Sequence, residues 1–350
     1  MAATDDVRWW GIKDWTDLDL VRAELAAGAD PNYGAFIFEK PLHAVADRGS
    51  PEVVAELAGL VDDVDAEREG RTALWMAVFE GHIDNARALV SAGADPWRPM
   101  MAGWSPGRLS LVGPAPDLFS PSPEAGLSAA EAATVAEAER LIPALGDFYY
   151  DGLGLACVAE LSAAEATARL EAVPADGVDI DELYEDSWNK PDAELIVGVT
   201  DVPGGCVIIQ PWGYTPSTRG LLERVSPGTV CYSMYANPKG GSSEDIARDG
   251  TVITAWQPHS AYTVPADASA EEILAAYLYR DHPVAFCCSG AGLRLAEPVR
   301  SSALTRGSSF PNETGGPEPA EMKKGPDPCS GAGSSDLVEM RGFEPLTPSM

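Results

Sequence analysis

The chain has few basic residues and few histidines. Its 350 residues include 24 lysines and arginines, 54 aspartates and glutamates and four histidines, so the formal net charge is −30 at pH 7. A surface of this sign repels phosphate backbones and anionic lipid headgroups. We therefore expect neither nucleic acid nor a membrane among the partners, and the charge favours a basic protein partner.

Cysteine is also scarce, and long apolar runs are lacking. The six cysteines are absent from residues 1–150 and form no C-x-x-C pair, which fits reduced thiols in the cytosol. No apolar run reaches the roughly 18 residues that a membrane helix needs. The N-terminal stretch "MAATDDVRWW" lacks the basic and apolar regions of a secretory signal. We expect a cytoplasmic protein without a cofactor or a metal site.

One short motif, "GADP", occurs twice, at 28–31 and at 93–96. Shifting the sequence by 32 positions lays "KPLHAVADRGSPEVVAEL" (40–57) over "TALWMAVFEGHIDNARAL" (72–89). Each copy has the pattern of a short helix that ends at glycine, a turn, and a second helix with apolar residues at helical spacing. The interval of 65 residues is therefore two repeats, and the middle copy of the motif has degenerated to "LVDD" at 60–63.

These segments resemble the ankyrin repeat over about residues 8–112. "KPLHAVADRG" and "GRTALWMAVFEGH" are similar to its first helix, and "GADPN" is similar to its closing turn. The resemblance implies an N-terminal α-solenoid of helix-turn-helix repeats that binds another protein through its turn tips and concave face. Trp75 stands where the family usually carries histidine, so hydrogen bonding at that position is an open question.

The matching residues have structural roles in the repeat. A glycine just after a helix adopts left-handed backbone freely, and an aspartate before proline accepts backbone N–H groups within its turn. The resemblance places two histidines at structural positions, where they hold turns and helix ends together. The residues expected to be structural are Gly28, Asp30, His43, Gly49, Gly81, His82, Gly93 and Asp95.

Stacked repeats bury their apolar faces only against their neighbours, so both ends of the array need a cover. The tryptophan-rich stretch 5–21 is expected to cover the N-terminal end. A helix is predicted over 128–146, with Ser128 as its N-cap and Glu131 at the capping-box position. We expect this helix to close the array and to lead into the next domain.

Two turn tips, 32–40 and 96–104, are apolar where polar turns would be usual. Aromatic, methionine and arginine side chains suit the desolvated centre of a protein interface. The alternative is that they pack against the second domain of the same chain. The candidate partner-binding residues are Tyr33, Phe36, Phe38, Trp97, Arg98, Met100, Met101 and Trp104.

After about residue 147, short β-rich runs replace the helical repeat, at 154–161, 193–202, 205–214, 229–238 and 251–258. Helices are predicted at 162–172, 215–225 and 269–280, and Asp249-Gly250 has the composition of a hairpin turn. This order predicts an α+β domain with a mainly antiparallel sheet. Residues 150–290 resemble an actinobacterial domain family of uncharacterised function, which implies no catalytic residues.

Catalytic motifs are lacking in this region. Cys287 and Cys288 are expected on a strand, where neighbouring thiols point to opposite faces, and buried. A Cys288–His282 or a Ser289–His259 pair remains possible from the sequence. A deep pocket around Trp188, Trp212 and His259 would favour an enzyme. The leading hypothesis is a protein-interaction scaffold, and the alternative is that the α+β module is an uncharacterised enzyme whose substrate the repeats recruit.

The expected boundaries are a repeat domain at 1–122, a capping helix with linker at 123–146, an α+β domain at 147–299 and a tail at 300–350. The tail is rich in glycine, proline and serine and cannot bury enough apolar surface to offset the entropy of ordering. It is expected to be disordered, and its removal after Arg300 is expected to leave folding unchanged.

Overall fold

The chain folds into two compact units, each built from two chain segments. The computed structural model describes residues 9, 12–33, 40–120, 122, 126–146, 152–175, 196–210, 212–239, 242–254, 263–294 and 336–340. The first unit comprises Met1–Ala136 and Pro258–Arg280, and the second comprises Glu137–Gln257 and Asp281–Met350. The segment Pro258–Arg280 therefore belongs with the repeats, whereas the sequence placed it in an α+β domain over 147–299.

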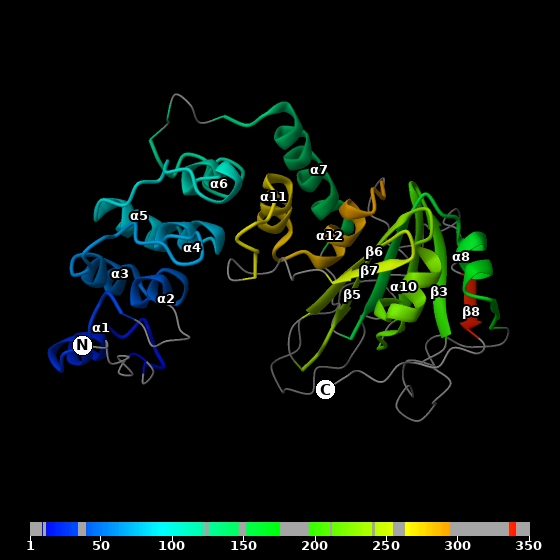
Figure 1. Cartoon of the computed structure of the whole chain (residues 1–350), viewed down its shortest axis with the longest axis horizontal. Helices are drawn as coiled ribbons and strands as arrows, with labels where there is room; N and C mark the ends of the chain where they lie inside the picture. Colours follow the sequence, from blue (N-terminus) through cyan, green and yellow to red (C-terminus); the bar gives the residue numbers. More distant parts are fainter. Residues whose placement is uncertain are drawn as a thin grey trace, which may run out of the picture. The chain divides into compact units, whose positions relative to one another are not determined.

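The first unit is a stack of helix pairs (Figure 1). Helix α4 contacts α2 and α6 in one row, and α3 contacts α1 and α5 in a second row beside it. We call these the inner and outer helices. This arrangement confirms the predicted α-solenoid. Its elements are α1 (Leu18–Ala26), α2 (Pro41–Arg48), α3 (Pro51–Ala58), α4 (Ala73–Phe79), α5 (Ile83–Ser91), η2 (Met101–Gly103), α6 (Pro106–Ser110), the start of α7 (Ala129–Leu145) and α11 (Ala270–Tyr279).

Side-chain caps and glycines set the ends of these short helices. The hydroxyl of Thr72 accepts from the backbone N–H of Trp75 at 3.1 Å and begins α4, and Ser105 begins α6 in the same way. Gly28 and Gly93 follow α1 and α5 with φ angles of 95° and 104°, a region that residues with a Cβ rarely adopt.

Helix α4 is buried along its whole length. All seven residues of Ala73–Phe79 are at most 1% exposed. A helix that is apolar on every side must be covered on every side. Helices α2, α5 and α6 contact it, and Tyr277 of α11 packs edge-to-face on Phe79 with ring centroids 5.5 Å apart. The inner row therefore receives part of its cover from a segment that lies far beyond the repeats in the sequence.

The helix predicted over 128–146 is present as α7. The hydroxyl of Ser128 accepts from the N–H of Glu131 at 3.2 Å, and the Glu131 carboxylate accepts from the N–H of Ser128 at 2.7 Å. These reciprocal bonds are the predicted capping box. Ser269 and Glu272 form a second capping box at the start of α11.

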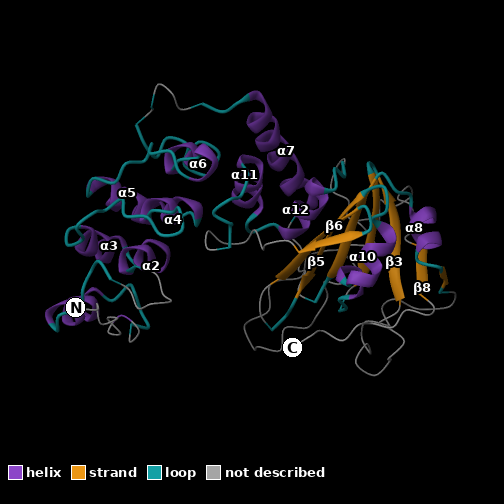
Figure 2. Cartoon of the chain, in the orientation of Figure 1, coloured by secondary structure: helices purple, strands orange, loops and turns teal. Residues whose placement is uncertain are grey.

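The second unit is an eight-stranded antiparallel sheet with helices (Figure 2). The strand order is β2-β8-β3-β4-β1-β5-β6-β7, and every described pairing is antiparallel, which confirms the predicted fold class. Its elements are β1 (Gly154–Ala159), α8 (Ala163–Arg169), β2 (Ala172–Pro174), β3 (Ile196–Val202), β4 (Gly205–Gln210), η4 (Thr215–Ser217), α10 (Arg219–Val225), β5 (Val230–Ala236), β6 (Ser242–Arg248), β7 (Thr251–Thr254), α12 (Pro283–Gly290) and β8 (Asp336–Met340).

The two faces of this sheet bury different side chains, because neighbouring residues on a strand point to opposite faces. One face forms the main core with α8 and α10, and its strand residues include Ala156, Val158 and Ile208. On the other face lies α12, where Phe286 packs edge-to-face on Tyr232 with centroids 5.8 Å apart.

Two local predictions for this unit have opposite outcomes. Asp249 and Gly250 both adopt positive φ angles, 50° and 77°, between β6 and β7, which confirms the hairpin turn. Cys287 and Cys288 were expected on a strand and instead lie in α12, so the strand prediction is wrong. The run "PVAFCCSG" is apolar without periodicity, and proline at its first helical position favours a helix start.

A strand from the tail enters the sheet. Among residues 300–350 the structure describes only Asp336–Met340, which pairs as β8 with β2 on one side and with β3 on the other. Met340 is fully buried in the core of the sheet. Disorder in the rest of the tail is a prediction that lies outside the described residues.

Strand β8 contradicts the expectation that removal of the tail after Arg300 leaves folding unchanged. A chain that stops at Arg300 loses β8, so β2 loses the partner it has in the described sheet and the core loses Met340. We expect a lower melting temperature for the sheet unit, since burying a methionine side chain contributes about 1.5–3 kcal/mol. Calorimetry on the full and the truncated chain measures the shift. Equal melting temperatures would mean that β8 does not stabilise the sheet.

None of the described helices could serve as a membrane span.

Candidate partner-binding surface

The turn tips of successive repeats are hydrogen-bonded to one another. The side chain of Asn32 accepts from the backbone N–H of Asp62 at 2.8 Å. One repeat later, the carboxylate of Asp65 accepts from the N–H of Asp95 at 3.1 Å. Arg98 then donates to the carbonyl of Asp65 at 3.2 Å. We call this continuous edge, formed by residues 30–33, 62–71 and 95–98, the tip row.

An aspartate holds each turn of the tip row. Asp30 accepts from the N–H of Asn32 at 2.8 Å, and Asp95 accepts from the N–H of Trp97 at 2.9 Å. Asp63 accepts from the N–H of Asp65 at 2.9 Å in the same way. The middle repeat, whose motif is degenerate in the sequence, therefore keeps the turn aspartate one position later than expected.

Partial burial raises the pKa of the Asp65 carboxyl, while the N–H of Asp95 and the positive charge of Arg98 offset part of that rise. Arg98 also forms an ion pair with Glu67, with 2.6 Å between nitrogen and oxygen. The tip row is thus a charged edge that its own side chains keep in a defined shape.

Three of the predicted partner-binding residues lie in the tip row. Tyr33 is 58% exposed, and the Arg98 side chain is 43% exposed. Trp97 is half-buried: its indole nitrogen donates to the carbonyl of Ser120 at 3.2 Å, and its ring covers Gly107 so closely that a Cβ there would overlap it. Phe36 and Phe38, the other predicted residues of the first tip, lie outside the described residues.

The remaining three predicted residues turn inward. The sulfur of Met100 accepts from the Thr72 hydroxyl at 3.8 Å. Met101 is buried against Gly70, and Trp104 is fully buried. The structure therefore removes Met101 and Trp104 from the candidate set, because burial within the chain leaves no surface for a partner to cover. The apolar composition of the tip 96–104 reflects packing within the first unit at these two positions.

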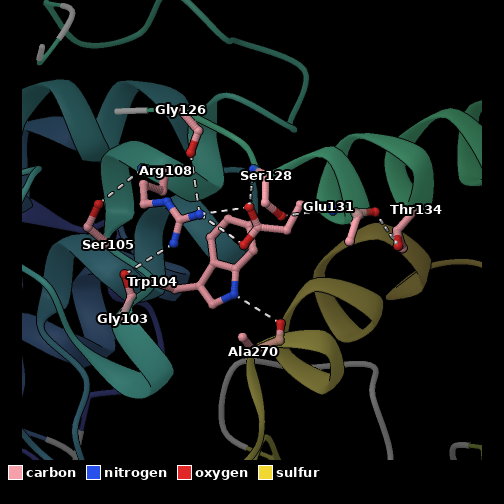
Figure 3. A network of polar contacts seen from close by, with 10 residues as sticks. Gly103, Trp104, Ser105, Arg108, Gly126, Ser128, Glu131, Thr134 and Ala270 are labelled. Carbon is pink, nitrogen blue, oxygen red and sulfur yellow. Dashed lines mark hydrogen bonds and ion pairs between the residues drawn. The ribbon is translucent and has the colours of Figure 1, made fainter. Parts of the chain in front are cut away.

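Trp104 and Arg108 join three segments of the first unit (Figure 3). The Arg108 guanidinium lies 4.4 Å from the centroid of the Trp104 ring and donates to both carboxylate oxygens of Glu131 at 2.9 Å. The Trp104 indole nitrogen donates to the carbonyl of Ala270 at 2.9 Å. The ends of α6, α7 and α11 therefore meet at one stacked, charge-assisted contact.

Burial, hydrogen bonding and the Arg108 charge all affect the pKa of the Glu131 carboxyl group. Desolvation raises the pKa of Glu131, but the bonds from Ser128 and Arg108 outweigh it, so the pKa lies below its usual value. Glu131 is therefore ionised at neutral pH. It serves both as the capping-box residue of α7 and as the partner of Arg108.

Buried polar groups connect the inner helices. The Nε2 atom of His43 lies 3.0 Å from the carbonyl of Arg71, and burial lowers the pKa of this histidine to about 4. Trp75 occupies the equivalent position one repeat later, and its buried indole nitrogen has no hydrogen-bond partner in the described part of the chain. The tryptophan therefore replaces a hydrogen bond between repeats with apolar contact.

Two further residues complete these connections. His82 is the N-cap residue of α5, and its Nε2 atom lies 3.8 Å from the carboxylate of Asp47. Asn85, which the sequence analysis missed, donates to the carbonyls of Val45, Ala46 and Gly49 at 3.0–3.3 Å. The Asn85 side chain, which belongs to α5, thus donates to carbonyls at the C-terminal end of α2, where the last carbonyls of a helix lack partners within the helix. A buried asparagine among the apolar positions of a helix is the signal that identifies such a residue.

The described thiols of the sheet unit are buried. The five described cysteines are all buried, and burial raises the pKa of Cys206 to about 12 and that of Cys287 well above its usual value. The sulfur of Cys288 lies 3.7 Å from that of Cys157. Since the thiolate is the nucleophilic form, the raised pKa values of Cys206 and Cys287 keep these two thiols protonated and unreactive at neutral pH.

Of the other predicted features of an enzyme, only the Cys288–His282 pair lies wholly within the described residues, and its two side chains differ in exposure. His282 is exposed at the start of α12, whereas Cys288 is buried against Cys157. Trp212 adopts a φ of 56° and covers Gly152, while His259 and Trp188 lie outside the described residues. Within the described ranges, no group of three or more His, Cys, Asp or Glu side chains is placed to hold a metal ion.

Comparison with known proteins agrees with the repeat architecture. No curated protein matches the chain. A family model described as ankyrin repeats, in three copies, matches residues 12–100. This range covers α1 to α5 and the whole tip row. Residues 12–100 of this chain are therefore ankyrin repeats.

Proposed function

We propose that this protein is a protein-interaction scaffold whose ankyrin repeats bind a protein partner through the tip row. Ankyrin repeats commonly bind proteins, which supports the general role. We choose this surface because two faces of the array differ in their exposure to solvent. The tip row keeps Tyr33 and Arg98 exposed, whereas the inner helix α4 is covered along its whole length.

The charge of the tip row favours a basic partner. Asp62, Asp63, Glu67, Glu69 and Asp95 are all exposed along it. Together with the net charge of −30, they create a field that attracts a basic surface and accelerates its association. Tyr33 and Trp97 supply aromatic surface next to these charges. We propose a cytoplasmic protein partner that needs no cofactor for binding.

Replacement of Arg98 by alanine tests this proposal. Arginines are frequent hot spots of interfaces because the planar guanidinium donates several hydrogen bonds and stacks on aromatic rings. We expect this loss to outweigh the gain in negative charge, so that partner binding weakens about tenfold, which corresponds to about 1.4 kcal/mol. Arg87→Ala is the matched control, because Arg87 is also an exposed arginine paired with one acid, Asp84 at 2.7 Å, but lies on the outer helix α5. Quantitative affinity capture from lysate, with each variant as bait, gives the comparison.

Stability should not distinguish the two variants. An exposed ion pair contributes about 0–1 kcal/mol, so both variants should melt close to the wild type. Weaker capture by Arg98→Ala alone supports the tip row. Equal capture by Arg98→Ala, Tyr33→Ala and wild type would show that the partner binds elsewhere.

A further inference from the structure

The segment Thr263–Arg280 lies on the inner side of the array and is held through its main chain. The guanidinium of Arg71 donates to the carbonyl of Val264. The indole nitrogen of Trp104 donates to the carbonyl of Ala270. Both donors are side chains of the repeat region, and both acceptors are backbone carbonyls, which every residue type possesses. These contacts therefore recognise a backbone conformation and not a particular sequence.

One side chain of the segment is recognised individually. The ring of Tyr277 packs edge-to-face on Phe79, and its hydroxyl end lies where a Cβ at Gly113 would overlap it. Arg280 lies over the Tyr277 ring, 5.3 Å from its centroid, and its guanidinium approaches Gly81 closely. The two glycines thus leave room for an aromatic anchor and for the cation beside it.

The segment has the form of a bound peptide. It runs without regular structure from Thr263 to Ser269 and continues as the ten-residue helix α11. Isolated helices shorter than about 12–15 residues are marginal in water, so α11 depends on the surface that it packs against. Binding of an amphipathic helix in a groove is a common mode of peptide recognition.

We propose that Arg71, Phe79, Gly81, Trp104 and Gly113 form a peptide-binding groove on the ankyrin array, and that Thr263–Arg280 is its built-in ligand. The ligand class is a peptide that begins with a turn, formed here by Pro265–Ala268, and continues as a helix that carries an aromatic anchor. The groove shares only the buried Arg71 with the tip row, and none of the exposed tip-row residues, so the proposal does not depend on the proposed function. A partner peptide of this class enters only when the built-in ligand is weakened.

The segment Thr263–Arg280 is covalently attached to the groove that it occupies, and this attachment decides whether a free peptide can compete with it. A ligand attached to its own receptor acts at an effective concentration in the millimolar range. A free copy of the same peptide at micromolar concentration therefore cannot displace it from the wild-type chain. A substitution that removes the anchor from the built-in copy, but not from the free peptide, reverses this competition.

The test uses a fluorescently labelled synthetic peptide with the sequence of residues 263–280. Fluorescence polarisation measures its binding to the full-length wild type and to full-length Tyr277→Ala. We expect binding to Tyr277→Ala to be at least tenfold tighter than to the wild type. Adding Gly113→Ala to the Tyr277→Ala chain should abolish binding, because the new methyl group overlaps the position of the anchor hydroxyl.

Arg280→Ala is a milder variant that keeps the experiment decisive if Tyr277→Ala does not fold. It removes the cation beside the anchor and leaves the ring in place, so we expect a smaller gain in peptide binding. Circular dichroism confirms that each variant retains its helices. If the folded variants do not bind the peptide, the segment is a permanent part of the core. If the wild type binds it equally well, the peptide binds outside the groove. Either result overturns the proposal.

Discussion

Replacement of Trp104 by alanine is expected to lower the stability of the first unit by about 3–5 kcal/mol, the usual cost of removing a large aromatic side chain from a core. Trp104 is fully buried, stacks on the Arg108 guanidinium and donates to Ala270. Its loss leaves a cavity and removes the contact at which three segments of the unit meet. Denaturant unfolding, monitored by the helical circular dichroism signal, measures the change.

Two control variants separate the contributions of this tryptophan. Trp104→Phe keeps an aromatic ring but loses the hydrogen bond to Ala270, so it should cost less than the alanine variant. Trp97→Ala removes a half-buried tryptophan from the same tip and should also cost less. A cost of Trp104→Ala no larger than that of Trp97→Ala would contradict the central role of the buried contact.

Acidification is expected to destabilise the repeats through His43. Burial lowers the pKa of His43 to about 4 in the folded chain, from the ordinary histidine value of 6.5. Between these two values the unfolded chain binds more protons than the folded chain, so stability falls as the pH falls from about 6.5 towards 4. At pH 4.5 this group removes about 2–3 kcal/mol of stability relative to pH 7, since one pKa unit corresponds to about 1.4 kcal/mol.

The pH dependence of a variant chain isolates this contribution. His43→Gln cannot take up the proton, so its stability should fall less than that of the wild type between pH 7 and pH 4.5. His82→Gln is the control for replacing a histidine in the same array, because the His82 side chain is exposed. Parallel curves for wild type and His43→Gln would show that His43 is not protonated on unfolding in this range.

Local sequence signals predicted much of the fold. The repeat of "GADP" and the shift of 32 positions identified the stacked helix pairs, since each unit must place the same turn and helix residues at the same positions. The Ser128 and Glu131 capping box and the Asp249-Gly250 turn were predictable for the same reason, because each depends on residues close together in the chain.

Features that depend on distant contacts were not predictable. Strand β6 is polar, "SSEDIAR", and is recognisable only once β5 and β7 pair with it. Helix α11 was predicted as a helix, but nothing within residues 269–280 indicates that it packs on the repeats. For the same reason, the apolar tip 96–104 suggested a partner at Met101 and Trp104, where the chain supplies its own cover.

A fragment of the chain that contains only the repeats lacks part of the first unit, because that unit is built from two separate chain segments. The repeats and their α11 cover lie on either side of residues 137–257 in the sequence. A fragment that ends at residue 136 therefore contains all three ankyrin repeats but lacks Tyr277 and the Ala270 carbonyl. Experiments on partner binding should use the full chain, because the fragment exposes a face of α4 that the intact protein covers.

Hydrogen exchange on the full chain, read by mass spectrometry, measures how well the inner helices are covered in solution. If Thr263–Arg280 covers the inner helices in solution, amides of α11 and α4 should both be strongly protected, and Trp104→Ala should accelerate exchange in both helices. The tip row, which the account leaves open for a partner, should exchange faster. Rapid exchange in α11 beside a protected α4 in the wild type would contradict the account.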